Sequence, residues 1–280
     1  MGTDRQYQCR RGRVSRAAAP WSVALIAVVA AIVVVSAGAD ADGIQDRRKL
    51  ERKTFSDAEI LDGFFKISFG AEFRVGGDIV DRVRKYDGPV RVFIDNQAAL
   101  DRRGQLTKVI NEVGQRIKHL DIALTSQRNE ANMVVSLVRE RDLGRAIQAL
   151  YGRYEAPRIQ RSLEPQCLSG YSKDDSYRIR HAEVILVVDA GEFTFYDCAY
   201  EEILQALGPI NDDASIPWTM FNDAVHMGFF DIYDQLLLNV LYDPRIRPGM
   251  SRQEARAVVP AILPEVRHFV ARINGLAQAP

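Results

Sequence analysis

The N-terminal 39 residues most restrict how this chain can fold, because a basic stretch precedes a long uncharged segment. Five arginines lie within positions 5–16, and residues 21–39 carry no charge. The apolar run 25–35 is followed by Ala37-Gly38-Ala39, a small-x-small pattern typical of signal-peptide cleavage sites. Residues 1–39 are therefore expected to direct export and to stay outside the folded domain.

Two outcomes remain open for this segment. The small residues favour cleavage after about Ala39. Alternatively, the 19 uncharged residues at positions 21–39 are just long enough to cross a bilayer core of about 30 Å and stay as an anchor. Arginines before an apolar run keep that end cytoplasmic. The rest of the chain is expected in the bacterial envelope, either periplasmic or secreted, or anchored to the membrane.

Charge and cysteine content limit the function of the exported part. The chain has 37 basic and 37 acidic residues, and residues 40–280 hold 32 and 36 of them. A mildly acidic domain does not suit nucleic acid. Outside the export segment, Cys167 and Cys198 are an even pair in a disulfide-permissive compartment. We expect a disulfide that stabilises by about 3–4 kcal/mol, with two buried thiols as the alternative.

The hydrophobic pattern predicts one domain over residues 55–280 after a polar stretch at 40–54, which is interpreted as a linker or a solvated helix. Apolar residues recur with helical spacing from Leu106 to Leu120. Ser56 with Glu59 and Ser251 with Glu254 form capping-box patterns.

Strands are expected at 90–94, 122–124, 133–138 and 182–188, with further helices at 141–151, 197–207 and 231–242. Residues 152–180 are expected to be irregular, and Pro260 and Pro264 to split the C-terminus into two short helices. The predicted class is α+β, a small mixed sheet of about four strands with packed helices.

The most informative segment begins at the 197–207 helix. Spacing there follows the pattern His-Glu-x-x-His-x-x-Gly-x-x-His of zinc peptidases. The corresponding positions hold a series in which no histidine occurs: Glu201, Glu202, Gln205, Gly208 and Asn211. Met220 follows nine residues later and resembles the Met-turn of the same proteins. The segment therefore resembles the zincins, and more narrowly the metzincins, which implies a zincin-like fold with Glu201, Gln205 and Asn211 at ligand positions and Glu202 at the base position.

A second resemblance is more specific. Residues 198–250 resemble an uncharacterised family of bacterial exported proteins, domain of unknown function 2927. The shared residues include Cys198, Glu201-Glu202, Gln205 to Gly208, Asn211-Asp212, Met220 to Asp223, Tyr233-Asp234 and Leu241 to Pro244. The resemblance covers roughly residues 55–250 and implies no known activity. Pro209 departs from the family pattern where an aliphatic residue is usual, and no lipidation cysteine follows the apolar run.

The altered ligands weaken the zinc hypothesis, because Gln205 and Asn211 offer neutral carboxamides to a metal that prefers His, Cys and carboxylates. The interpretation we favour is a degenerate site with no cofactor and a binding or structural role, the partner being an envelope protein or a cell-wall component. The alternative is a metal-dependent hydrolase with Glu202 as general base.

Three smaller possibilities stay open beside these two. Another divalent cation is the first, held by Glu201 with Asp212 or Asp213. The second is an approach of His226 to Glu201. The third concerns the arginine-rich stretch 139–161, which is interpreted as a solvated face or as a surface for anionic lipid or polymer.

Overall fold

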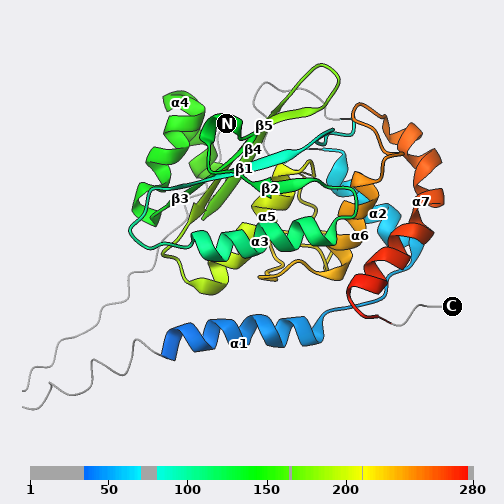
Figure 1. Ribbon diagram of the computed structural model, residues 1–280, viewed down its shortest axis with the longest axis horizontal. Coiled ribbons are helices and arrows are strands. Elements are labelled where there is room, and N and C mark those ends of the chain that lie inside the picture. Colours follow the sequence, from blue (N-terminus) through cyan, green and yellow to red (C-terminus); the bar gives the residue numbers. More distant parts are fainter. Residues whose placement is uncertain (1–34, 71–80, 164–165, 210, 277–280) are drawn as a thin grey trace, which may run out of the picture.

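A mixed β-sheet forms the centre of the fold (Figure 1). The structure is a computed structural model that describes residues 35–70, 81–163, 166–209 and 211–276. Nearly all of the predicted apolar run 25–35 and the basic stretch before it lie outside these residues. Among the described helices, none is long and apolar enough to cross a membrane.

The sheet has the strand order β2-β1-β3-β5-β4. All neighbouring strands are parallel except β4, which pairs antiparallel with β5 at one edge. Five strands are present in the described part of the chain, where about four were predicted. Their bounds are β1 Val90–Asn96, β2 Ile122–Leu124, β3 Met133–Val138, β4 Cys167–Lys173 and β5 Ile179–Val187.

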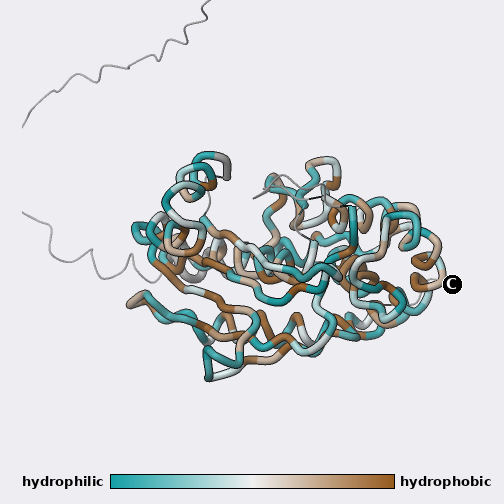
Figure 2. The backbone as a smooth tube through the Cα atoms, turned by 90° about the horizontal axis from the view of Figure 1, so that it is seen from above, coloured by the Kyte–Doolittle hydropathy of each residue, from teal (hydrophilic) through white to brown (hydrophobic). Residues whose placement is uncertain are grey.

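Helices cover both faces of the sheet. Helices α3 (Arg103–Arg116) and α5 (Glu192–Ala206) pack on one face over the larger core, and α4 (Glu140–Leu163) packs on the other over a smaller one. A group formed by α2 (Asp57–Ser68), α6 (Ile232–Tyr242) and α7 (Arg252–Ile273) lies at one end of the molecule (Figure 1). Figure 2 shows the alternation of hydrophobic and hydrophilic segments that this layered packing requires.

Two adjacent buried cations connect this helical group to the segment that enters β1. The Arg84 guanidinium donates to the carbonyls of Ser68 and Gly70 at the end of α2. Lys85 Nζ donates to the carbonyls of Leu241, Asp243 and Ile246 after α6, at 2.8, 3.2 and 2.7 Å. The last carbonyls of a helix lack intrahelical partners and carry negative partial charge. Each cation therefore completes a helix C-terminus inside the protein.

Several local predictions are confirmed. Both capping boxes are formed, at Ser56 and at Ser251. The disulfide between Cys167 and Cys198 joins β4 to α5. The periodic segment that starts at Leu106 is helical in α3, although the helix ends at Arg116 and the later apolar residues are buried beyond it.

The C-terminal prediction is wrong, because α7 is a single helix that includes Pro260 and Pro264. Both prolines lie on its exposed side, where water can satisfy the carbonyls that lose a helical partner. The buried stripe of α7, which includes Val259, Ile262 and Leu263, packs against α2 and α6. Tertiary packing of this stripe outweighs the local cost of the prolines.

The prediction of an irregular segment at 152–180 is also wrong. Helix α4 continues beyond Gly152, and β4 follows it. Gly152 has φ 75° and ψ 166°, a conformation suited to glycine, and there the chain reverses. A Cβ atom on Gly144 would lie 2.3 Å from Gln160 Nε2, so the two arms of α4 lie side by side. We refer to α4 as the helical hairpin.

The polar stretch 40–54, expected as a linker or a solvated helix, is helical up to Leu50 in α1 (Val35–Leu50), and several of its side chains contact the domain. The Arg48 guanidinium lies over the ring of Phe229, and that of Arg52 lies over Trp218. Glu51 accepts a hydrogen bond from the backbone N–H of Ile232 at the start of α6. The segment is therefore attached to the domain by several side chains.

Replacing Lys85 tests the buried cation. We expect Lys85→Met to lower the free energy of unfolding by about 2–3 kcal/mol, because three carbonyls lose their donor in a buried site. Burial lowers the pKa of Lys85 to about 8, so the side chain is still a cation at pH 7. Urea denaturation at pH 7 measures the change. Lys53→Met, at an exposed lysine, is the matched control and should change stability little.

Candidate functional site

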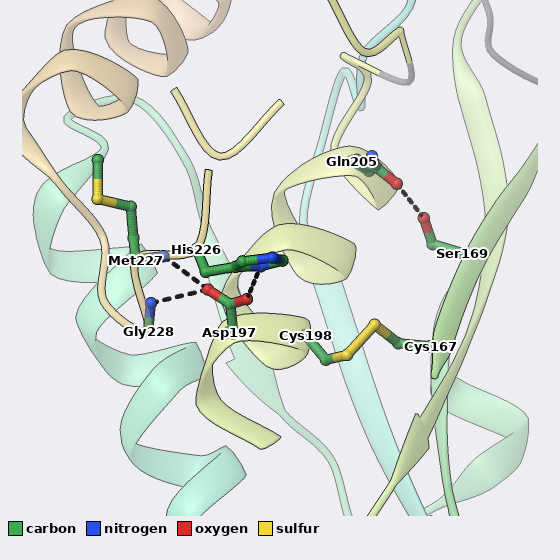
Figure 3. The surroundings of a disulfide bond; sticks show 8 residues. All are labelled: Cys167, Ser169, Asp197, Cys198, Gln205, His226, Met227 and Gly228. Carbon is green, nitrogen blue, oxygen red and sulfur yellow. Dashed lines mark hydrogen bonds and ion pairs between the residues drawn. A yellow bond between two sulfur atoms is a disulfide. The ribbon is translucent and has the colours of Figure 1, made fainter. Parts of the chain in front are cut away.

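Helix α5 carries the candidate site and lies beside the edge strand β4 (Figure 3). The disulfide fixes its middle to the start of β4, and the Gln205 carboxamide near its end accepts a hydrogen bond from the Ser169 hydroxyl at 3.3 Å. Helix and strand are thus joined twice along their length. The polar face of α5 keeps a defined position relative to the sheet.

The loop 211–228 folds across α5 and is attached to the helix near both of the loop's own ends. Gln205 Nε2 donates to the Asp212 carboxylate at 3.0 Å. Asp197, two turns earlier, accepts hydrogen bonds from the backbone N–H groups of Met227 and Gly228 at 2.7 and 2.9 Å (Figure 3). Because both ends are held, the residues between them gather over the exposed side of the helix.

Three carboxylates meet where the loop crosses the helix. Oxygen atoms of Glu201, Asp212 and Asp223 all lie within 4.8 Å of one another. We call this group the acidic cluster. Glu201 forms no hydrogen bond or ion pair within the described part of the chain. Its pKa is raised well above the usual range, mainly by burial and then by the negative charges of Glu202, Asp212, Asp197 and Asp223.

Glu202 lies on a different side of α5 and is buried. Its negative charge contributes to raising the pKa of Tyr151 to about 12, after burial, which is the larger cause. The Tyr151 hydroxyl in turn lies over Gly170 of β4, 2.3 Å from where a Cβ atom would stand. The charge of Glu202 thus acts on Tyr151 and on Glu201, and the group of three carboxylates does not include Glu202.

The predicted ligand positions have separate partners. Gln205 bonds to Ser169 and Asp212, as described above. Asn211 turns away toward α2, where its Nδ2 donates to the Lys66 carbonyl at 3.0 Å. Its Oδ1 would lie 2.6 Å from a Cβ atom on Gly70, whose φ is 141°. Asn211 thus packs against the end of α2, and the three predicted positions Glu201, Gln205 and Asn211 do not form one ligand set.

Met220 is buried in the loop, and the segment around it is held by a buried acid. The Met220 backbone N–H and the Thr219 hydroxyl donate to the two oxygens of Asp234 at 2.9 and 2.5 Å. Burial raises the pKa of Asp234 and of its neighbour Asp231, which caps α6. Asp234 thereby joins the Met220 turn to the first turn of α6.

Two other predicted contributors lie elsewhere. His226 Nδ1 is 2.9 Å from the Asp197 carboxylate, and His226 is not part of the acidic cluster (Figure 3). Asp213 accepts from Ser215 in its own turn. Sequence reasoning missed the pairing of Asp223 with Glu201 and the role of Asp197. Asp197 and Glu201 do stand four residues apart on one helix face, which is a usable signal.

The fold and site define an α/β domain in which a helix bears an acidic polar face beside an antiparallel edge strand. A family model described as Protein of unknown function (DUF2927) matches residues 57–261. The chain belongs to this family. Searches of curated proteins and of solved structures give no match.

The raised pKa of Glu201 predicts a pH-dependent effect of Glu201→Gln. A carboxyl with a raised folded-state pKa binds a proton that the unfolded chain releases, so its contribution to stability is lost as pH rises above about 4.5. Glutamine does not ionise, so the Glu201→Gln variant does not lose this stability as the pH rises. We expect it to raise the free energy of unfolding by about 2 kcal/mol at pH 8 and little at pH 4.

Thermal unfolding at both pH values measures this difference. Asp175→Asn removes an exposed acid as the matched control and should be neutral at either pH. Equal effects of Glu201→Gln at pH 4 and pH 8 would contradict the electrostatic account of the acidic cluster.

Proposed function

We propose that the chain is an exported envelope protein whose domain binds or supports another envelope component, and that the zincin-like spacing on α5 serves a structural role. The observation that carries this proposal is that the side chains at two predicted ligand positions form hydrogen bonds with different parts of the fold. Gln205 joins α5 to β4 and to the loop, and Asn211 packs on α2. Catalytic zinc needs three ligands converging on one point, and these side chains serve different elements.

Export is part of the same proposal. The order of arginines, apolar run and small residues supports delivery across the cytoplasmic membrane. The disulfide is consistent with an oxidising compartment. The protein is then periplasmic or secreted, or tethered through residues 21–39 as an accessory subunit. Its partner is an envelope protein or a cell-wall component, since the domain's charge does not suit nucleic acid.

Metal analysis with a peptidase assay tests this proposal. The full-length chain, purified from an exporting cell, is expected to hold no stoichiometric zinc and to cleave a mixed peptide library no faster than its Glu202→Gln variant. In this interpretation no metal-activated water lies beside Glu202. The Glu202→Gln substitution therefore removes no peptidase activity. Stoichiometric metal together with activity that is lost in Glu202→Gln would overturn the proposal.

A second candidate is a metal-dependent hydrolase, which the acidic cluster favours. Three carboxylates fit a hard cation such as Ca²⁺, Mg²⁺ or Mn²⁺, which prefer oxygen ligands, better than they fit zinc. Glu201, Asp212 and Asp223 would hold the ion. A bound cation lowers the pKa of a coordinated water, and Glu202 would be the general base. In this candidate the positive ion would also offset the negative charges that, after burial, raise the pKa of Glu201.

Thermal unfolding with and without divalent cations distinguishes the two candidates. Ligand binding to the folded state stabilises it by about 2.7 kcal/mol at a concentration 100 times the dissociation constant. On the hydrolase candidate, Mn²⁺ or Ca²⁺ raises the melting temperature of the full chain but not of Glu201→Gln. On the primary proposal, neither protein responds to either cation more than the Asp175→Asn control does.

A further inference from the structure

The helical hairpin α4 has a charge unlike the rest of the exported domain. Residues 139–163 contain six arginines and three acids, whereas the remainder of residues 40–280 contains 26 basic and 33 acidic residues. The hairpin packs on the sheet through buried apolar residues, and five of these arginines are exposed: Arg141, Arg145, Arg153, Arg158 and Arg161. The hairpin is thus a basic surface on an acidic domain.

Part of this positive charge has no partner among the residues that the structure describes. Arg139 and Arg145 pair with Asp142, and Arg158 pairs with Glu155. Arg141 and Arg161, one on each arm, form no hydrogen bond or ion pair with any residue that the structure describes. Arginine recognises phosphate groups by paired hydrogen bonds as well as by charge. The outer face of the hairpin therefore has guanidinium groups available for an anionic partner.

The reversal at Gly152 adds apolar side chains to the basic surface. Leu150 and Tyr154, on either side of this glycine, are 40% and 77% exposed. The Arg153 guanidinium lies 4.9 Å from the Tyr154 ring centroid. Tyrosine is favoured at the membrane–water interface because one end is apolar and the other polar. Exposed leucine and tyrosine beside arginines favour a lipid surface as the partner. A purely polyanionic polymer offers these side chains nothing apolar to contact.

The hairpin is also suitably placed relative to the export segment. The start of α1 and the hairpin lie toward the same end of the molecule, opposite α7 (Figure 1). The apolar run 25–35 ends where α1 begins. A membrane that holds this run would therefore lie near the end of the domain that carries the hairpin. Repulsion between anionic lipid and the acidic remainder of the domain favours the same orientation.

We propose that the outer face of the helical hairpin docks on an anionic phospholipid bilayer, with Leu150 and Tyr154 entering the interface and the arginines contacting lipid phosphates. The buried side of the hairpin, which includes Leu143, Ile147 and Ile159, stays packed on the sheet. Docking fixes the domain to the membrane surface through the hairpin.

Fluorescence of a labelled full-length chain tests this proposal. Cys9 is the only cysteine outside the disulfide, so Tyr154→Cys in a Cys9→Ser background accepts one environment-sensitive nitrobenzoxadiazole label. The protein is reconstituted into phosphatidylglycerol or phosphatidylcholine vesicles. We expect a blue shift in phosphatidylglycerol that is absent in phosphatidylcholine and reversed by 1 M salt, because salt screens charge. A label at exposed Gln253 on α7 should show no shift.

Charge variants complete the test. Each arginine near an anionic surface contributes about fivefold to binding, so the triple variant R141Q/R145Q/R161Q should lower the docked-to-free ratio on the order of 100-fold. The variant R247Q/R256Q/R272Q removes equal charge near and on α7 and should leave the shift intact. The same spectrum in both lipids, or an equal loss with either triple variant, would overturn the proposal.

Discussion

Two consecutive buried cations, Arg84 and Lys85, are the interaction on which the arrangement of this domain depends. Their side chains complete the C-termini of α2 and α6, so the helical group at one end is attached to the chain that enters the sheet at β1. That attachment has consequences for the site. Helix α2 provides the carbonyl that Asn211 binds, and α6 provides the Asp234 carboxylate that holds the Met220 turn. The loop over α5 therefore takes its shape from helices that the cations fix in place.

The acidic cluster is a result of this loop geometry more than of the helix that bears Glu201. Glu201 reaches two aspartates only because the loop is fixed by Gln205 at one end and by Asp197 at the other. Burial and then the negative charges of the neighbouring acids raise the pKa of Glu201. Such a group either takes up protons or offers oxygen ligands to a cation. Both candidate functions are compatible with this geometry. They differ in whether protons or a metal cation neutralise the acidic cluster.

Local patterns in the sequence predict much of the fold. Capping boxes at Ser56 and Ser251 and the periodicity after Leu106 are confirmed because each depends on residues within a few turns. The irregular assignment of residues 152–180 fails because the reversal at Gly152 divides one amphipathic pattern into two short arms. In the site, helix spacing places Glu201, Glu202 and Gln205 correctly on α5, yet the partners of Asn211 and Asp223 are set by contacts between distant segments. Spacing along one helix carries no information about these contacts.

The disulfide also affects the order in which parts of the domain unfold locally. Cys167 and Cys198 enclose β4, β5 and the first half of α5 in one covalent ring, the two positions being 31 apart in the sequence. Closing such a ring removes much of the conformational freedom that its segments would gain on opening. The opposite edge, the short strand β2, has no comparable restraint and pairs only with β1. Hydrogen exchange would then proceed inward from β2, and the ring that includes the first half of α5 would be the last cooperative unit to open.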